Sequence, residues 1–173
     1  MRARRPDVVD DEIVAVTRAV LPLALSLCRS REEAEDVLAE AVGCCLDRWR
    51  SGRIDHPRAY LRAAVVNEVR QRHRRRGRLR LTPLFHDDGD QLASPAADTD
   101  RIDDELTVRA ELRKLPERQR LAVSLRYLED LPYEAIADLM GVAVGTAKSQ
   151  VSRGVARLGA TLAESRTQEA CDG

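Results

Sequence analysis

The chain has 173 residues, with 29 Lys or Arg against 29 Asp or Glu, so its formal net charge is zero. Hydrophobic residues make up 43% and charged residues 34%, which is enough apolar material for a core and too much charge for a membrane-embedded protein. No apolar stretch approaches the roughly 20 residues of a spanning helix, and the first residues lead into acids instead of a secretory signal. We therefore expect a cytoplasmic protein of one or two small domains that does not bind membranes.

Helical patterns account for the first half of the chain. Apolar residues recur at three- and four-residue spacing over residues 11–29, which predicts an amphipathic helix. Ser30 and Glu33 have the spacing of a capping box, so a second helix begins there; its outward face is acidic over the first two turns. Pro57 suits the first position of a third helix, which we expect to run to about residue 76. With 3% aromatic residues and almost no strand-like alternation, the chain is predicted to be all-α.

Charges of opposite sign are segregated along the chain. Between residues 58 and 80 nine arginines stand against one acid, Glu68, whereas between residues 87 and 105 eight acids stand against Arg101. Basic runs are often solvated helix faces, and cations also suit a helix C-terminus. The density of positive charge on one helix nevertheless favours a nucleic-acid partner.

The helical pattern stops after residue 77, where proline, glycine and acidic residues accumulate up to about residue 100. This interval is longer than the connections usual inside one compact domain. The sequence therefore predicts two small helical domains, over residues 11–77 and 102–163, joined by a flexible acidic linker over residues 78–101.

The second half contains a helix-turn-helix pattern. Residues 133–140 predict a short helix, residues 141–143 a tight turn and residues 144–162 a longer helix. Gly141 gives the turn its backbone freedom, and the small Ala137 fits where the two helices would cross. Ile136, Met140, Val142, Ala147, Val151 and Leu158 are expected to share one core. Between Val144 and Leu158 there are three cations and no acid, which suits a helix lying along DNA.

Residues suited to catalysis or metal binding do not converge. The three histidines lie on a loop, a basic helix and the linker, and no nucleophile-elbow, phosphate-loop or zinc-protease motif is present. We expect neither enzymatic activity nor a cofactor. The cysteines form no C-x-x-C pair and are expected to be ordinary small residues. A redox or metal role stays open for Cys28, Cys44 and Cys45.

Both halves together resemble one family, the extracytoplasmic-function (ECF) sigma factors, which are two-domain initiation subunits of bacterial RNA polymerase. The resemblance covers roughly residues 12–162. It is carried by Leu21–Leu25, Arg31–Glu40, Pro57–Leu61 with the arginine run, Leu115–Gln119, Leu125–Ala137 and Val144–Arg153. The second-half motifs also occur in other helix-turn-helix regulators, whereas both sets in this order are more specific.

The resemblance implies that the chain binds core RNA polymerase. Asp36 and Glu40 match the family motif that docks on the clamp helices of the largest polymerase subunit, and acids suit a basic partner surface. Ala39 stands where the family usually has glutamine.

The resemblance also implies contacts with the minus-ten promoter element. The loop 51–56 and Asn67 match the positions that hold an extruded base. The arginines after them would bind phosphates, giving affinity and salt dependence more than sequence choice. The predicted residues are Asn67, Arg70, Arg72, Arg74, Arg75 and Arg76. Tyr60 stands where the family often has tryptophan, and Gln71 where it often has aspartate.

The last helix would read the minus-35 element in the major groove. The family pattern places Lys148, Ser149, Ser152 and Arg153 toward the bases and Thr146, Arg126 and Arg157 toward phosphates. Lysine and arginine favour guanine edges, so we expect a guanine-containing element.

An anti-sigma factor is the family's usual regulator and is expected as a further partner. Two alternatives stay open at this stage. The chain could be a free-standing helix-turn-helix regulator that does not join polymerase, or a degenerate sigma-like protein that only binds an anti-sigma factor.

Overall fold

A computed structural model describes residues 6–79 and 104–171, and these ranges contain seven helices and no strand. The predicted all-α class is therefore confirmed. The chain divides into two compact units, residues 1–87 and 88–173. Of the linker predicted over residues 78–101, only its first two residues, which close a helix, lie within the described residues. No helix in the described part of the chain combines the length and apolarity needed to cross a bilayer.

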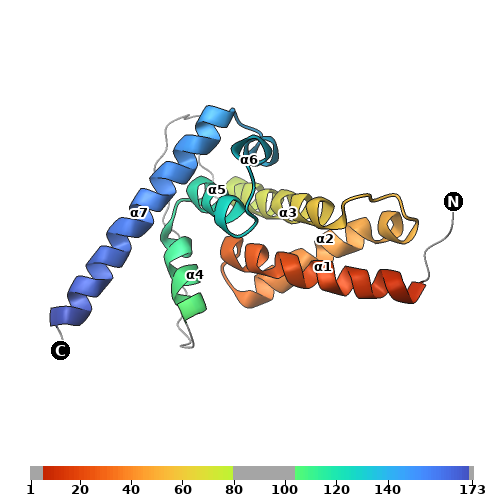
Figure 1. The fold of residues 1–173 in the computed structure, drawn as a ribbon, viewed down its shortest axis with the longest axis horizontal. Coiled ribbons are helices and arrows are strands. Elements are labelled where there is room, and N and C mark those ends of the chain that lie inside the picture. Colours follow the sequence, from red (N-terminus) through yellow and green to blue (C-terminus); the bar gives the residue numbers. More distant parts are fainter. Residues whose placement is uncertain (1–5, 80–103, 172–173) are drawn as a thin grey trace. The chain divides into compact units, whose positions relative to one another are not determined.

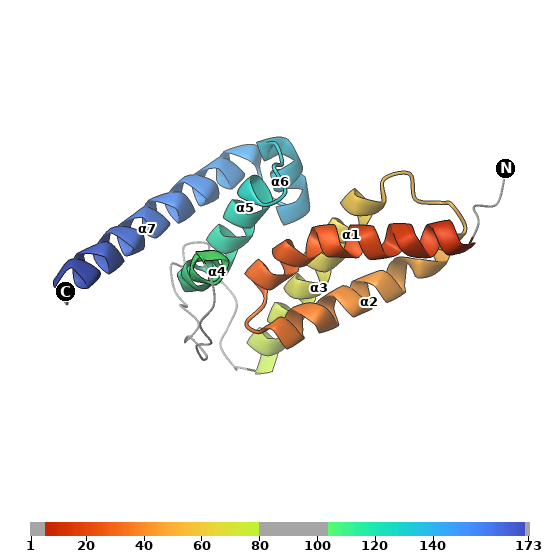
Figure 2. The same cartoon turned by 60° about the horizontal axis from the view of Figure 1, so that its bottom comes forward.

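The first unit is a three-helix bundle of α1 (Pro6–Leu27), α2 (Arg31–Arg50) and α3 (Pro57–Leu79), each packed against the other two (Figure 1). The short connection between α1 and α2 makes them antiparallel neighbours, which Figure 2 shows side by side. The apolar faces of the three helices enclose a core that includes Leu23 of α1, Val37 of α2 and Leu61 of α3. Trp49 is also buried there, and its indole N–H donates a 3.1 Å hydrogen bond to Glu12 of α1.

The predicted capping box is present at the start of α2, with one difference. The Ser30 hydroxyl accepts a 3.1 Å hydrogen bond from the Glu33 amide, as the motif requires. The Glu33 carboxylate accepts from the Arg29 amide at 2.9 Å, one residue before the expected partner. Two backbone N–H groups at this helix start are thus satisfied by side chains.

Three helices differ in extent from the sequence-based expectation. Helix α3 continues to Leu79 instead of ending at about residue 76. Helix α1 begins at Pro6 and not at residue 11, because proline is well accommodated in the first turn of a helix. Helix α7 continues to Cys171 instead of ending near residue 162. Residues 163–171 contain no glycine or proline, so nothing in the sequence ends the helix near residue 162.

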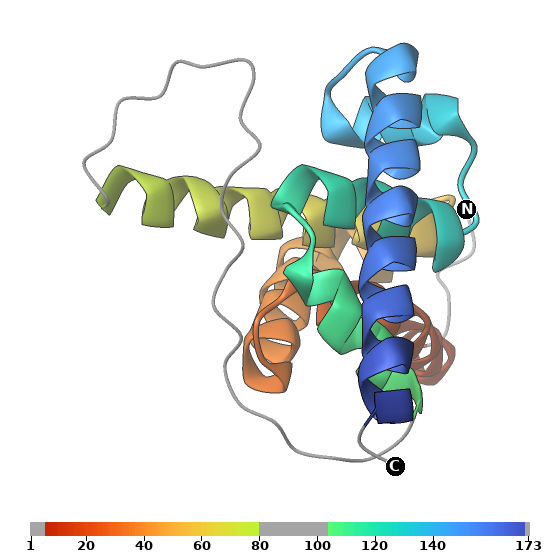
Figure 3. The same cartoon turned by 90° about the vertical axis from the view of Figure 1, so that its left-hand side faces the viewer.

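The second unit consists of α4 (Asp104–Lys114), α5 (Glu117–Tyr127), α6 (Tyr133–Met140) and α7 (Val144–Cys171). Helix α7 packs against the other three, and Figure 3 shows it running past α6 and α4. Gly141 ends α6 with φ 67°, and the Val142 amide bonds back to the Ala137 carbonyl at 3.0 Å. This left-handed cap makes the sharp turn, so the helix-turn-helix is present as predicted.

The predicted single core of this unit divides into two. Ile136, Met140, Ala147 and Val151 are buried between α6 and α7, and Val142 is half-buried. Leu158 instead packs against a separate cluster of Leu112, Leu115 and Val123. The reason is the length of α7, whose later turns have passed α6 and lie on other helices.

Gly154 marks a close approach of α7 to α5. A Cβ atom at this position would lie 2.6 Å from Cγ2 of Val123 and 3.4 Å from Cβ of Gln119. Only glycine therefore fits at the observed separation, and this contact sets how α7 is held against α5.

Candidate nucleic-acid interface

Helix α7 presents a basic face opposite the one that it buries. Ala147, Val151 and Gly154 face inward at helical spacing. The residues predicted to meet DNA lie on the remaining surface: Thr146, Lys148, Ser152, Arg153 and Arg157 are exposed, and Ser149 is half-buried. The Ser149 hydroxyl donates to the Thr146 carbonyl at 2.8 Å. Over residues 144–161, where the structure describes the side chains of α7, this surface carries cations and no acid, so it can lie against a phosphate backbone without charge repulsion.

Tyr133, the first residue of α6, brings two of the predicted cations together. The guanidinium of Arg126 lies 5.5 Å and the ammonium of Lys148 lies 5.6 Å from the centre of the Tyr133 ring. Both distances are within the range of cation–π attraction. No sequence pattern indicates this role for Tyr133, because its ring and Lys148 meet only once α6 packs on α7.

Arg126 is also tied to the loop between α5 and α6. One of its Nη atoms donates to the Leu131 carbonyl at 3.0 Å and approaches the Asp130 carboxylate at 3.4 Å. Asp130 has a positive φ of 48°, a backbone conformation uncommon for a residue with a side chain. Arg126 therefore braces this loop, in addition to the phosphate contact that the sequence predicts for it.

The predicted minus-ten residues lie on α3, outside its buried stripe of Leu61, Val65 and Val69. Asn67, Arg74 and Arg75 are exposed, and Arg70 and Arg72 are half-buried. The side chain of Arg76 lies outside the described residues. The structure thus places the described members of this group along one helix.

Arg72 differs from its neighbours because it links two helices. It donates at 2.9 Å to Glu68, one turn earlier in α3, and lies 3.1 Å from Glu40 of α2. The Glu68–Arg72 spacing of four residues is a signal for such a pair in the sequence, whereas the contact with Glu40 depends on how α2 and α3 pack. Arg72 is therefore engaged within the protein, which the sequence-based assignment to phosphates did not anticipate.

Asp36 and Glu40 are exposed on α2, opposite buried Val37 and Ala41. The pKa of Glu40 is lowered from its ordinary value of 4.5, first by a hydrogen bond with Glu68 and then by the hydrogen bond and charge of Arg72. The same two carboxylates raise the pKa of Arg72 against the opposing effect of burial. The predicted polymerase-docking acids therefore lie on one surface, and one of them carries a stabilised negative charge.

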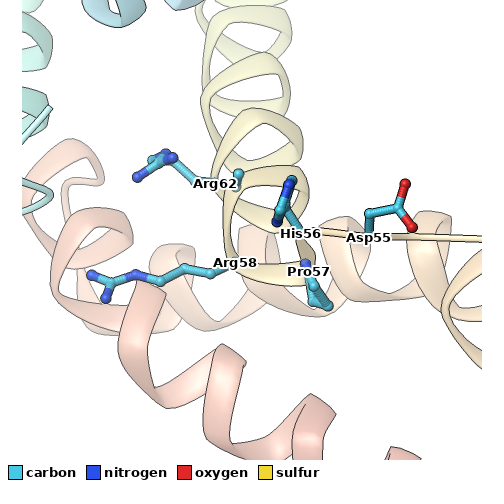
Figure 4. A pocket seen from close by; sticks show the side chains of 6 residues that line it. Asp55, His56, Pro57, Arg58 and Arg62 are labelled. Carbon is cyan, nitrogen blue, oxygen red and sulfur yellow. The ribbon is translucent and has the colours of Figure 1, made fainter. Parts of the chain in front are cut away.

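A hollow of about 410 Å³ lies beside the start of α3. Figure 4 shows Arg58 and Arg62 extending to the same side of α3, with Asp55 directed away from them. The loop residues Asp55 and His56 line the hollow, as the predicted base-holding loop would require, but Asn67 does not. The complete lining is Asp55, His56, Pro57, Arg58, Ala59 and Arg62.

The three cysteines whose side chains the structure describes do not gather into a site. Cys28 and Cys45 are buried and Cys44 is exposed, and none of the three forms a disulfide. Burial, and then the neighbouring Cys44, raise the pKa of Cys45. Among the residues that the structure describes, no group of three or more His, Cys, Asp or Glu side chains is placed to hold a metal ion.

Comparison with known proteins relates both units to transcription initiation subunits. Residues 13–79 match sigma-70 region 2, and residues 105–158 match sigma-70 region 4. The chain is 32% identical over 162 residues to the ECF RNA polymerase sigma factor EcfG of Rhodopseudomonas palustris, an alignment covering 90% of this chain and 86% of that protein. It is 32% identical over 145 residues to the RNA polymerase sigma-E factor of Streptomyces coelicolor, covering 81% and 77% respectively.

A solved structure of a sigma factor is also similar to this chain. The sigma factor RpoE of Bartonella quintana, determined in complex with the anti-sigma factor NepR, superposes with a TM-score of 0.66 at 28% identity, over 88% of this chain and 95% of that one. Two sigma-70 regions in the order 2 then 4, on a two-unit helical fold, define a small sigma factor. The chain belongs to the ECF sigma factors of RNA polymerase, and its function is transcription initiation.

Proposed function

We propose that this sigma factor divides its work between three surfaces. The acidic face of α2 at Asp36 and Glu40 docks on the clamp helices of the largest polymerase subunit. The loop before α3, with Asn67 and the arginines of α3, holds the minus-ten element and supports DNA melting. The basic face of α7 enters the major groove of the minus-35 element.

The observation that supports this division most directly is the segregation of charge on helix surfaces. The acids of α2 and the cations of α7 each lie opposite a buried stripe, so each face is available to a partner of opposite charge. A basic DNA-facing surface and an acidic protein-facing surface cannot exchange roles, because the wrong partner would be repelled.

The reading face of α7 can be tested with purified protein, core polymerase lacking any sigma factor, and fragmented DNA of the source genome. We expect discrete transcript starts that share two spaced upstream elements. Lys148→Ala and Arg153→Ala should change which promoters are used, since each base contact contributes about 1–3 kcal/mol. Arg18→Ala, which removes an exposed cation from α1, is the matched control and should leave the choice unchanged. Unaltered promoter choice in both α7 variants would contradict the assignment.

The docking face is tested by charge reversal. Asp36→Lys should weaken binding to core polymerase, measured by co-elution or fluorescence anisotropy, because it places a cation before a basic surface. Asp11→Lys makes the same change of charge at an exposed residue of α1, and this variant should bind normally. Equal binding by both variants would show that the acidic face of α2 is not the docking surface.

We also propose that an anti-sigma factor regulates this chain by covering its polymerase-facing surfaces. The solved relative from Bartonella quintana is bound to such a partner. The expected result is that a protein which binds this chain tightly also prevents it from binding core polymerase. A tightly bound partner that leaves core binding intact would contradict this form of regulation.

A further inference from the structure

The ring of Tyr133 lies near two of the cations that the proposed function assigns to DNA. It lies at the start of α6, while the two cations near it come from α5 and α7. A single half-buried side chain of α6 thus contacts residues from α5 and α7, the two other helices around the proposed minus-35 reading surface.

The two cations are held in different ways. Arg126 is fixed by the Leu131 carbonyl and the Asp130 carboxylate as well as by the ring. For Lys148, the Tyr133 ring is the one interaction found within the part of the chain that the structure describes. The orientation of the Lys148 side chain therefore depends on Tyr133 to a degree that the orientation of Arg126 does not.

Orientation matters for a lysine that reads a base. Its ammonium sits on a flexible four-carbon stem, so ordering that stem at the moment of binding reduces the net gain from the contact. An aromatic ring that attracts the ammonium without neutralising it reduces the number of conformations before DNA arrives. A carboxylate partner would also order the lysine, but it would compete with the base for the charge.

We infer that Tyr133 is a positioning residue for promoter recognition: its ring holds Lys148 in the conformation that meets the minus-35 bases, and so sharpens discrimination at that base pair. The inference rests on the proposed role of α7 as the reading helix. It extends that role by making a residue of the preceding helix, which need not touch a base, a determinant of specificity.

The test uses the full chain with core polymerase and a set of promoters substituted at each minus-35 position. Tyr133→Leu removes the ring and keeps a smaller apolar side chain, whereas Tyr133→Phe keeps the ring and removes the hydroxyl. Tyr133→Leu should reduce the preference for the favoured base by about two- to fivefold, as expected for a cation–π contact at a partly exposed site. The loss should be confined to the position that Lys148→Ala also affects, and Tyr133→Phe should retain the wild-type preference.

A double mutant separates positioning from a general effect on the fold. In a Lys148→Ala background, Tyr133→Leu should cause no further loss of discrimination, because the group that the ring positions is absent. An additional loss in that background, an equal reduction at every position, or failure of Tyr133→Phe to preserve the preference would each overturn the inference. If Lys148→Ala itself leaves the profile unchanged, the reading-helix assignment fails first; if only Tyr133→Leu is without effect, the positioning role fails alone.

A measurement on the unmodified protein covers the case in which Tyr133→Leu does not fold. The ε-methylene protons of Lys148 should show an upfield ring-current shift in the NMR spectrum of the free chain, because the ammonium lies over the ring. Random-coil shifts for these protons would show that the ring does not hold Lys148 in solution, and would overturn the inference.

Discussion

Gly154→Ala tests the packing that places the reading helix on its support. Glycine in the middle of a helix costs about 0.5–1 kcal/mol relative to alanine, so this substitution would ordinarily stabilise α7. Here the new methyl group would lie 2.6 Å from Cγ2 of Val123. Val123 is β-branched and buried in α5, so it cannot rotate away freely. The clash should therefore outweigh the gain in helix propensity.

The magnitude follows from comparison with a second glycine of the same helix. Gly159 has nothing within 4 Å of its added Cβ, so Gly159→Ala shows the propensity gain alone. Overpacking a well-filled interior costs about 1–3 kcal/mol. We therefore expect Gly154→Ala to be about 1–3 kcal/mol less stable than Gly159→Ala. Each kcal/mol corresponds to about 4–8 °C in melting temperature for a unit of this size.

The assay is thermal unfolding of the full chain, followed by circular dichroism and by tryptophan fluorescence. Trp49 is the one tryptophan of the sequence and lies in the first unit, so its fluorescence serves as an internal control. The helical signal should show the difference between the two variants, while the Trp49 transition should stay at the wild-type temperature. Equal stability of Gly154→Ala and Gly159→Ala would refute the argument that α5 and α7 are at their limit of approach.

Two further predictions concern titratable groups of the first unit. Because the pKa of Glu40 in the folded state lies below its ordinary 4.5, the ionised carboxylate stabilises the fold above that pH, and the advantage is lost as the pH falls through the lowered value. Urea unfolding of wild type and Glu40→Gln from pH 7 to pH 3 should show a difference that shrinks on acidification; a difference that grows would contradict the pairing with Arg72. Exposed Cys44 should be alkylated by iodoacetamide well before Cys45, whose burial and raised pKa keep it as the thiol; equal rates by peptide mass spectrometry would show that Cys45 is accessible.

The features that could be predicted from the sequence are those set by local rules. Ser30 caps α2 because the helix itself places the Glu33 amide within reach of the Ser30 hydroxyl. Gly141 turns the chain because few other residues adopt its left-handed backbone conformation. The outward acids of α2 and cations of α7 follow in the same way from a period of 3.6 residues. Each of these depends only on residues within a few positions of one another.

The contacts that could not be predicted join residues from different helices. Arg72 reaches Glu40 because α3 packs on α2, and no spacing rule relates two residues so far apart. Gly154 looks like an unfavourable residue within a helix until the position of Val123 is known. Sequence patterns therefore identify which face of each helix is outward, but not which outward residues are already engaged by a neighbouring element.

This difference affects how the basic residues should be interpreted. A count of the cations on α3 and α7 assumes that every arginine and lysine is equally available to phosphates. The net charge of zero makes the same assumption, because a sum does not distinguish charges by their surroundings. The structure separates them: Arg72 is shared between two carboxylates, Arg126 braces a loop, and Lys148 is held by an aromatic ring that leaves its charge intact. A cation paired with a carboxylate must exchange that partner to bind DNA, whereas a cation over a ring keeps its full charge for the groove. The salt dependence of promoter binding should therefore decrease more when Lys148 is removed than when Arg72 is removed, although both residues carry one positive charge.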